Sequence, residues 1–97
     1  MRSVSVIIPT LNEEKWIVKI IAHLKKVASD SGSLEIIVAD GGSSDKTRES
    51  AGRAGAVVID SPKKGRASQM NAGADIASGG ILYFLHVDYF VRHFFQQ

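Results

Sequence analysis

The sequence has no cysteine, only two prolines and no apolar run long enough to cross a membrane. The absence of cysteine excludes a disulfide framework, a thiolate zinc site and a cysteine nucleophile, and it suits a reducing compartment. The first nine residues hold one basic residue and a short apolar run, which is typical of neither a signal peptide nor a membrane helix. We therefore expect no transmembrane segment and a cytoplasmic location, with peripheral attachment to the membrane left open.

The sequence also has little surplus charge of either sign. Twelve Lys and Arg against ten Asp and Glu give a net charge of +2 at pH 7. Because nucleic-acid binding needs a clustered basic face, we expect no nucleic-acid partner. The 97 residues are 44% apolar and 23% charged, as in ordinary globular proteins. This length predicts a single domain over residues 1–97 with a thin core.

Short apolar runs alternate with segments of helical periodicity along the chain. The pattern predicts strands at residues 3–9, 34–39, 56–59 and 81–85, and helices at residues 13–29, 45–54 and 66–78. This alternation predicts an α/β fold, a Rossmann-like parallel sheet of about four strands with flanking helices and right-handed crossovers.

The helices have predicted inward faces. In the first helix this face holds Trp16, Ile17, Ile20, Ile21, Leu24, Val27 and Ala28; in the second it holds Thr47, Ala51 and Ala54, and in the third Ala67, Met70, Ala74 and Ala77. Thr10 and Glu13 have the spacing of a capping box for the first helix, and Asn12 is an alternative N-cap.

Polar residues gather where three of the predicted strands end. The clusters are Thr10, Asn12 and Glu13; Asp40, Gly41, Gly42 and Ser43; and His86 with Asp88. In parallel sheets, ligands bind outside the carboxyl ends of the strands. The nearby helix N-termini carry free N–H groups and partial positive charge, which suit phosphate.

The loop after the second strand, DGGSSDKT from Asp40, has two readings. It is either a turn followed by a helix cap, or a site where Asp40 accepts hydrogen bonds from a base or ribose while the glycines admit the ligand. It is not a Walker loop, and no G-x-G-x-x-G follows the first strand.

Two further groups of side chains are ambiguous from the sequence alone. His86 and Asp88, two apart on an extended chain, point the same way and could share a divalent ion whose shell a diphosphate completes. The alternative is a helix-capping carboxylate beside a structural histidine. Lys63, Lys64 and Arg66 are either a solvated loop or a cationic rim for a diphosphate.

Four ordered segments resemble the motifs of the family 2 inverting glycosyltransferases, which have the GT-A fold. They are VSVIIPTLNEE (4–14), EIIVADGGSSDKT (35–47), KGRASQMNAG (64–73) and LYFLHVD (82–88). The resemblance implies the N-terminal, nucleotide-binding half of a GT-A domain. It implies binding of a nucleoside diphosphate sugar, for sugar transfer to an acceptor hydroxyl.

The resemblance also implies roles for individual residues. The nucleotide site would comprise Pro9, Thr10, Leu11, Asn12, Glu13, Asp40, Gly41, Asp45 and Arg66. Within it Asp40 would bond the base, Asp45 would support the site and Arg66 would lie near the diphosphate. Asp88 would bind Mn²⁺ or Mg²⁺. His86 replaces the first Asp of the family's Asp-x-Asp, and its imidazole favours Mn²⁺.

The last nine residues depart from the family pattern. Family members have a second half that carries the acceptor site and a general base, whereas residues 89–97 contain no Asp or Glu and hold four of the seven aromatic residues. We expect the pattern to end after residue 88, through truncation or a frame change, and assign no catalytic residue. The alternative functions are a nucleotide-binding or protein-interaction module without catalysis, or a product without function.

The same tail predicts self-association. The fourth strand would be a sheet edge, and Tyr89, Phe90, Phe94 and Phe95 would have little sheet to cover them. We expect a homodimer through residues 81–95. The alternative is that the tail folds back over the sheet as an amphipathic helix.

Overall fold

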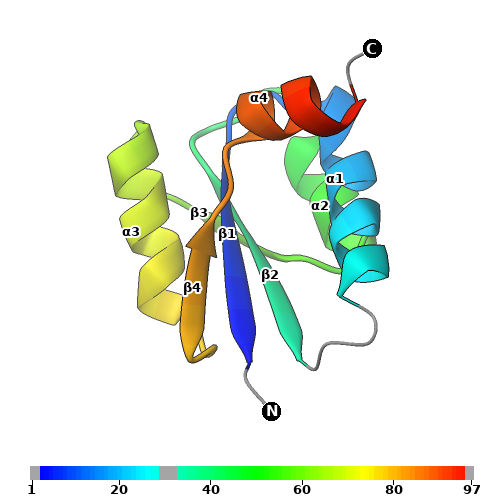
Figure 1. The fold of residues 1–97 in the computed structure, drawn as a ribbon. Coiled ribbons are helices and arrows are strands. Elements are labelled where there is room, and N and C mark those ends of the chain that lie inside the picture. Colours follow the sequence, from blue (N-terminus) through cyan, green and yellow to red (C-terminus); the bar gives the residue numbers. More distant parts are fainter. Residues whose placement is uncertain (1–2, 29–32, 96–97) are drawn as a thin grey trace.

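All seven predicted strands and helices form in the computed structural model, which describes residues 3–28 and 33–95 (Figure 1). The elements are β1 (Val4–Thr10), α1 (Glu14–Val27), β2 (Leu34–Asp40), α2 (Thr47–Arg53), β3 (Val57–Asp60), α3 (Arg66–Ile76) and β4 (Ile81–Phe84). A short helix, α4 (Val87–Phe90), and a π-helical turn, η1 (Val91–Phe95), follow. The predicted end of the first helix, residue 29, lies outside the described residues.

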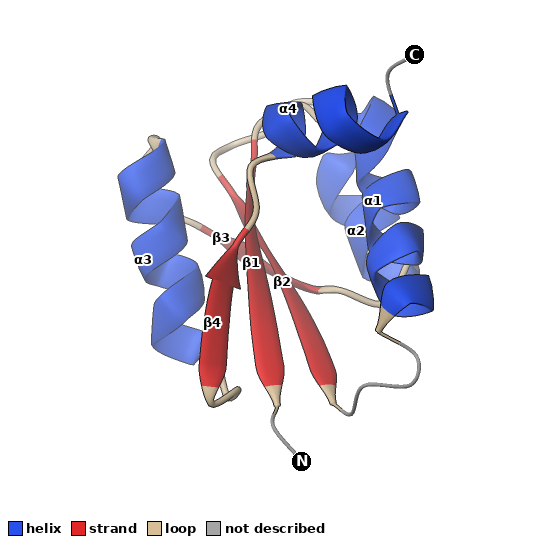
Figure 2. Cartoon of the chain, in the orientation of Figure 1, coloured by secondary structure: helices blue, strands red, loops and turns tan. Residues whose placement is uncertain are grey.

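The four strands form one parallel sheet in the order β3-β2-β1-β4. Helices α1 and α2 cover one face and α3 covers the other (Figure 2). Successive side chains of a strand point to opposite faces, so Val6 and Ile8 join the core cluster with Ile20 of α1, whereas Ile7 faces Gly73 of α3. The predicted α/β class, Rossmann-like and parallel, is confirmed.

The inward face predicted for α3 is only partly right. Met70, Ala74 and Ala77 are half-buried and Ala67 is exposed, whereas the fully buried residues of the helix are Gln69 and Gly73. A Cβ on Gly73 would lie 2.5 Å from Ile7 Cγ2, so the missing side chain lets α3 approach β1 closely. The prediction selected the most apolar stripe, but here close approach and polar anchoring decide which face is buried.

The inward faces of α1 and α2 are largely as predicted. Ile17, Ile20, Ile21, Thr47 and Ala51 are buried. Val27 is the exception: it lies exposed in the last turn of α1 and lines an open groove beside β4.

The aromatic tail packs against α1, so the expectation that its four aromatic residues lack cover is only half right. Phe90 is 3% exposed, and the Phe95 ring stacks on Trp16 of α1 with centroids 5.8 Å apart. Tyr89 and Phe94 remain exposed. Among the described residues, no helix has the length and apolar character that a membrane crossing requires.

Candidate functional site

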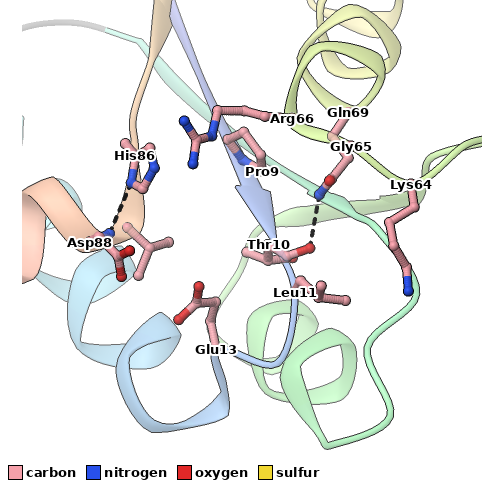
Figure 3. Close-up of a pocket in the computed structure, with 11 residues that line it drawn as sticks. Pro9, Thr10, Leu11, Glu13, Lys64, Gly65, Arg66, Gln69, His86 and Asp88 are labelled. Atoms are coloured by element: carbon pink, nitrogen blue, oxygen red, sulfur yellow. Dashed lines mark hydrogen bonds between the residues drawn. The ribbon is translucent and has the colours of Figure 1, made fainter.

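A pocket of about 250 Å³ lies at the carboxyl edge of the sheet (Figure 3). Its walls come from the loop after β1, the start of α3 and the segment after β4: Pro9, Thr10, Leu11, Glu13, Lys64, Gly65, Arg66, Gln69, His86, Val87 and Asp88. Two of the three predicted polar clusters therefore meet in one cavity, together with the cationic loop before α3. Asn12, Asp40, Gly41 and Asp45 do not line it.

Asp40, at the end of β2, is fully buried and bonds Thr10, which lines the pocket. Its Oδ1 accepts hydrogen bonds from the hydroxyls of Thr10 (2.8 Å) and Ser43 (2.6 Å). Its Oδ2 accepts from the backbone N–H groups of Gly42 (2.9 Å) and Ser43 (2.7 Å). Burial raises the pKa of the Asp40 carboxyl, but these hydrogen bonds outweigh burial and hold it below the ordinary value. Asp40 thus ties the loop after β2 to the end of β1.

Asn12 joins the same two loops from the outside. Its φ of 55° is left-handed, a conformation that asparagine tolerates better than most residues. Its backbone N–H donates to Ser43 Oγ at 2.8 Å, and its Oδ1 accepts from the N–H groups of Ser44 (2.8 Å) and Asp45 (3.3 Å). In the structure Asn12 therefore serves loop geometry.

The cap predicted for the first helix is wrong in both versions. Neither Thr10 nor Asn12 caps α1, because their side chains bond the loop after β2 instead. The backbone N–H groups at the start of α1 find other acceptors. That of Glu13 donates to Thr47 Oγ1 at 2.8 Å, and that of Glu14 donates to Asp45 Oδ2 at 3.2 Å. Hydrogen bonds from Thr47 and Glu14 hold the pKa of Asp45 below its ordinary value. The start of α1 is thus capped by Asp45 and by Thr47, the first residue of α2.

The pocket carries both signs of charge. Lys64 and Arg66 come from the segment that leads into α3, whereas Glu13 follows β1 and Asp88 follows β4. In Figure 3 the head group of Arg66 lies toward His86, and Lys64 lies at the opposite end of the view. Partial burial and the negative charges of Asp88 and Asp45 raise the pKa of Glu13. The cationic side chains suit phosphate, and the carboxylates suit a cation.

His86 and Asp88 face the same pocket, but not through strand alternation as predicted. His86 is the last extended residue, and Asp88 lies in the first turn of α4. The backbone N–H of Asp88 donates to His86 Nδ1 at 3.1 Å, so this histidine caps the helix and only Nε2 is left for a ligand. In residues 3–28 and 33–95, no three His, Asp or Glu side chains are grouped to hold a metal. An Asp oxygen and an imidazole nitrogen fit Mn²⁺ chemistry, provided that a bound diphosphate and water complete the shell.

Gln69 is the pocket residue that sequence reasoning missed. It lies within the 64–73 motif, but it received no role because it falls outside the apolar stripe of α3. It is only 5% exposed, and its Nε2 donates to two backbone oxygens, Thr10 O and Ala39 O, at 2.8 Å each. Gln69 lies four residues before Gly73 and therefore on the same helical face. This spacing is the sequence feature from which its burial could have been predicted.

The chain belongs to the family Glycosyl transferase family 2, whose profile matches residues 5–93. The match includes residues 89–93, beyond the point at which we expected the family pattern to end. No curated protein sequence matches the chain.

Solved structures of glucosyl-3-phosphoglycerate synthase from Mycobacterium tuberculosis share the fold. The complex with Mn²⁺, UDP-glucose and phosphoglyceric acid superposes with a TM-score of 0.77 at 28% identity, over 89% of this chain and 33% of that one. The complex with UDP gives 0.77 at 30% identity, over 90% and 34%. A structure described only as a mycobacterial protein gives 0.75 at 28%, over 90% and 31%. The fold is thus that of GT-A glycosyltransferases, and the chain spans about a third of these relatives.

Proposed function

We propose that this chain binds the nucleoside diphosphate portion of a sugar donor at the pocket between β1, α3 and β4. The observation that carries the proposal is that two cationic residues, Lys64 and Arg66, and a carboxylate, Asp88, line one cavity at the carboxyl edge of the sheet. A diphosphate needs cationic groups, and a divalent ion bridging it needs a carboxylate. Relatives of the same fold are described with UDP, UDP-glucose and Mn²⁺, which supports the same ligand class here.

The roles that we propose for the lining residues follow from their positions in the pocket. Arg66 and Lys64 hold the diphosphate, and Pro9, Thr10, Leu11 and Glu13 line the nucleoside side. The cavity of about 250 Å³ is below the roughly 300–1,000 Å³ of complete ligand sites, so it holds only part of a nucleotide sugar. Asn12, Asp40, Gly41 and Asp45 contribute through the shape of the loops. A direct bond from Asp40 to the base, as the family resemblance implies, stays a prediction.

Asp88 and the free Nε2 of His86 are the side-chain atoms we propose for Mn²⁺ or Mg²⁺. A divalent ion held there would stabilise the negative charge that develops on a departing nucleoside diphosphate. His86 Nδ1 is already bonded to the backbone N–H of Asp88, which fixes the ring orientation and turns Nε2 away from α4.

Transfer of the sugar to an acceptor hydroxyl is the reaction that such a donor site serves. The alternative is nucleotide binding without transfer, as a binding or protein-interaction module. Incubation of the chain with radiolabelled UDP-glucose, Mn²⁺ and candidate acceptors separates the two. A labelled glycoside identifies transfer, and binding without glycoside favours the module.

Titration calorimetry with UDP and Mn²⁺ tests the donor site. Arg66→Ala and Asp88→Ala should each weaken UDP binding by about tenfold or more, because each removes a charge-assisted contact. Asp75→Asn is the matched control, since Asp75 is exposed on α3 and lies outside this pocket. Unchanged affinity in both pocket variants would overturn the assignment.

We also propose that residues 81–95 mediate a homodimer. Ile81, Leu82, Tyr83 and Phe84 of the edge strand β4 are 38–58% exposed, and beside them lies an apolar groove of about 780 Å³. An uncovered strand edge can pair with the same edge of a second copy about a two-fold axis. Sedimentation equilibrium at tens of micromolar tests this proposal, and a monomer at that concentration would contradict it.

A cytoplasmic location, free or at the membrane surface, is the last part of the proposal. It is supported by the lack of cysteine in a chain whose proposed donor is a nucleotide sugar. Fractionation of cells producing a tagged chain checks it, and recovery from the exported fraction would contradict it.

A further inference from the structure

The side-chain amide of Gln69 is held so that the fold uses only one of its two polar atoms. Nε2 donates to Thr10 O and to Ala39 O, both at 2.8 Å. Rotating the amide by 180° would place Oε1 against these two carbonyl oxygens, which cannot donate a hydrogen bond. The orientation of the amide is therefore fixed by the backbone at the ends of β1 and β2.

The other atom, Oε1, is an acceptor without a protein donor. None of the described residues donates to it, and none of their fully buried side-chain oxygens or nitrogens lacks a partner. Oε1 is therefore not fully buried, although the residue as a whole is only 5% exposed, and Gln69 is one of the residues that line the pocket.

Gly41 makes the room that this acceptor occupies. A Cβ at Gly41 would lie 2.8 Å from Gln69 Oε1 and 2.9 Å from its Cδ. The amide thus fills the space that a side chain at position 41 would take, directly after β2. The neighbouring carboxylate, Asp40, already accepts four hydrogen bonds within the protein. Beside it, Gln69 Oε1 is an acceptor to which no described residue donates.

We propose that Gln69 Oε1 accepts a hydrogen bond from a ring N–H of the nucleobase, and so selects the base of the donor. This inference rests on the proposed nucleotide site. Uracil carries such an N–H at N3 and guanine carries one at N1, whereas cytosine presents an acceptor at N3. A fixed acceptor facing another acceptor leaves both unpaired, which disfavours cytosine. The pocket therefore takes nucleoside diphosphates whose base carries a ring N–H at this position in preference to CDP.

Calorimetry with UDP and CDP, each with Mn²⁺, tests the inference on the intact chain. The wild-type protein should bind UDP about 10–100-fold more tightly than CDP, since the penalty for an unpaired polar group is about 1–3 kcal/mol. Gln69→Met keeps the length of the side chain and removes both polar atoms, so the ratio should fall to about threefold or less. Asn71→Ala, an exposed amide removed from the same helix, should keep the wild-type ratio.

A second measurement uses the wild-type protein alone and does not depend on the folding of a variant. N3-methyl-UDP lacks the ring N–H and should bind at least tenfold more weakly than UDP. Equal affinities for UDP and CDP, or for UDP and N3-methyl-UDP, would overturn the inference, as would a Gln69→Met protein that keeps the preference. If 2′-deoxy-UDP lost affinity while UDP and CDP bound equally, the acceptor would belong to the ribose and the inference would be wrong. If no nucleotide bound, the proposed nucleotide site itself would fail.

Discussion

The two flanks of the sheet's carboxyl edge are built by different forces. The loops after β1 and β2 are joined by hydrogen bonds through Thr10, Asn12, Asp40, Ser43 and Asp45. The β4 side presents an exposed apolar strand, and its tail is held to α1 by aromatic stacking. Hydrogen bonds fix the geometry of the loops, whereas non-directional apolar contacts leave the β4 side able to accept a partner.

The difference predicts where substitutions act. On the loop side, Asp40 accepts four hydrogen bonds and Asn12 Oδ1 accepts from the loop after β2, so removing either side chain leaves several donors without their acceptor. On the β4 side, most side chains are already in contact with solvent, so replacing one should change the free energy of unfolding of the monomer only slightly. Four substitutions and one change of pH test this contrast.

Asp40→Ala should have the largest effect. It removes the acceptor of four hydrogen bonds at a fully buried position, and hydrogen bonds to charged groups are worth about 1.5–3 kcal/mol each when partners cannot be replaced. Because some donors will find water, we expect a loss of about 3–5 kcal/mol in the free energy of unfolding, measured by urea denaturation. A loss below about 1 kcal/mol would show that the loop pair does not depend on this carboxylate.

Acid should weaken the loop side through the same carboxylate. The pKa of Asp40 is lower in the folded chain than in the unfolded chain, so the unfolded chain binds the proton more readily. Its contribution is fully present above the ordinary Asp range near pH 3.9 and is lost as the pH falls through the lowered value. Urea denaturation between pH 7 and pH 3 should show this loss in the wild type. An Asp40→Asn protein with the same pH dependence would contradict the prediction.

Gly41→Ala should cost about 1–3 kcal/mol, because the added Cβ meets Gln69 Oε1 at 2.8 Å. A free glutamine would swing aside, but two hydrogen bonds anchor this one. In a Gln69→Ala background the same substitution should cost no more than about 0.5 kcal/mol, because the obstacle is gone. A double-mutant cycle by urea denaturation measures the coupling, and additive costs would mean that the two residues do not interact.

The fold could be predicted from the sequence because its signals are periodic. The apolar runs of β1 and β2 and the Ile17, Ile20, Ile21 stripe of α1 are local patterns that tertiary packing preserves. The carboxyl edge followed from the topology alone, since parallel strands place their ends together. The clusters after β1 and β4 therefore met in one pocket as expected, whereas the cluster after β2 does not line it.

The detailed roles could not be predicted, because they depend on partners distant in the sequence. Asn12 looks like a capping residue of its own loop, yet its side chain bonds the loop after β2, and Asp45 bonds Glu14 of α1 in addition to Thr47 of its own segment. Gln69 was missed because hydrophobic periodicity counts a polar residue as outward, and its burial depends on two backbone oxygens supplied by β1 and β2.

Asn12→Ala should have a moderate effect, a loss of about 1 kcal/mol in stability from the exposed hydrogen bonds to Ser44 and Asp45. Part of this loss comes from the backbone, since alanine is strained at a φ of 55°. Asn12→Gly keeps the conformation but loses the same hydrogen bonds, so the difference between the two variants isolates the strain. Equal stabilities by urea denaturation would show that the left-handed backbone carries no cost here.

Tyr83→Lys should have the smallest effect on the folded monomer and the clearest effect on association. Tyr83 is 58% exposed in the edge strand β4, so its replacement should change the free energy of unfolding by no more than about 0.5 kcal/mol. A lysine on an edge strand opposes pairing with a second strand, because the pairing would bury a charge or set two like charges together. Under the proposed homodimer, sedimentation equilibrium should show a Kd at least tenfold weaker for Tyr83→Lys than for the wild type.

Glu49→Lys is the control for this variant. It introduces the same lysine at an exposed position on α2, away from β4, and should leave the Kd unchanged. A Tyr83→Lys protein that associates as tightly as the wild type would place any self-association elsewhere and leave the β4 edge without a role.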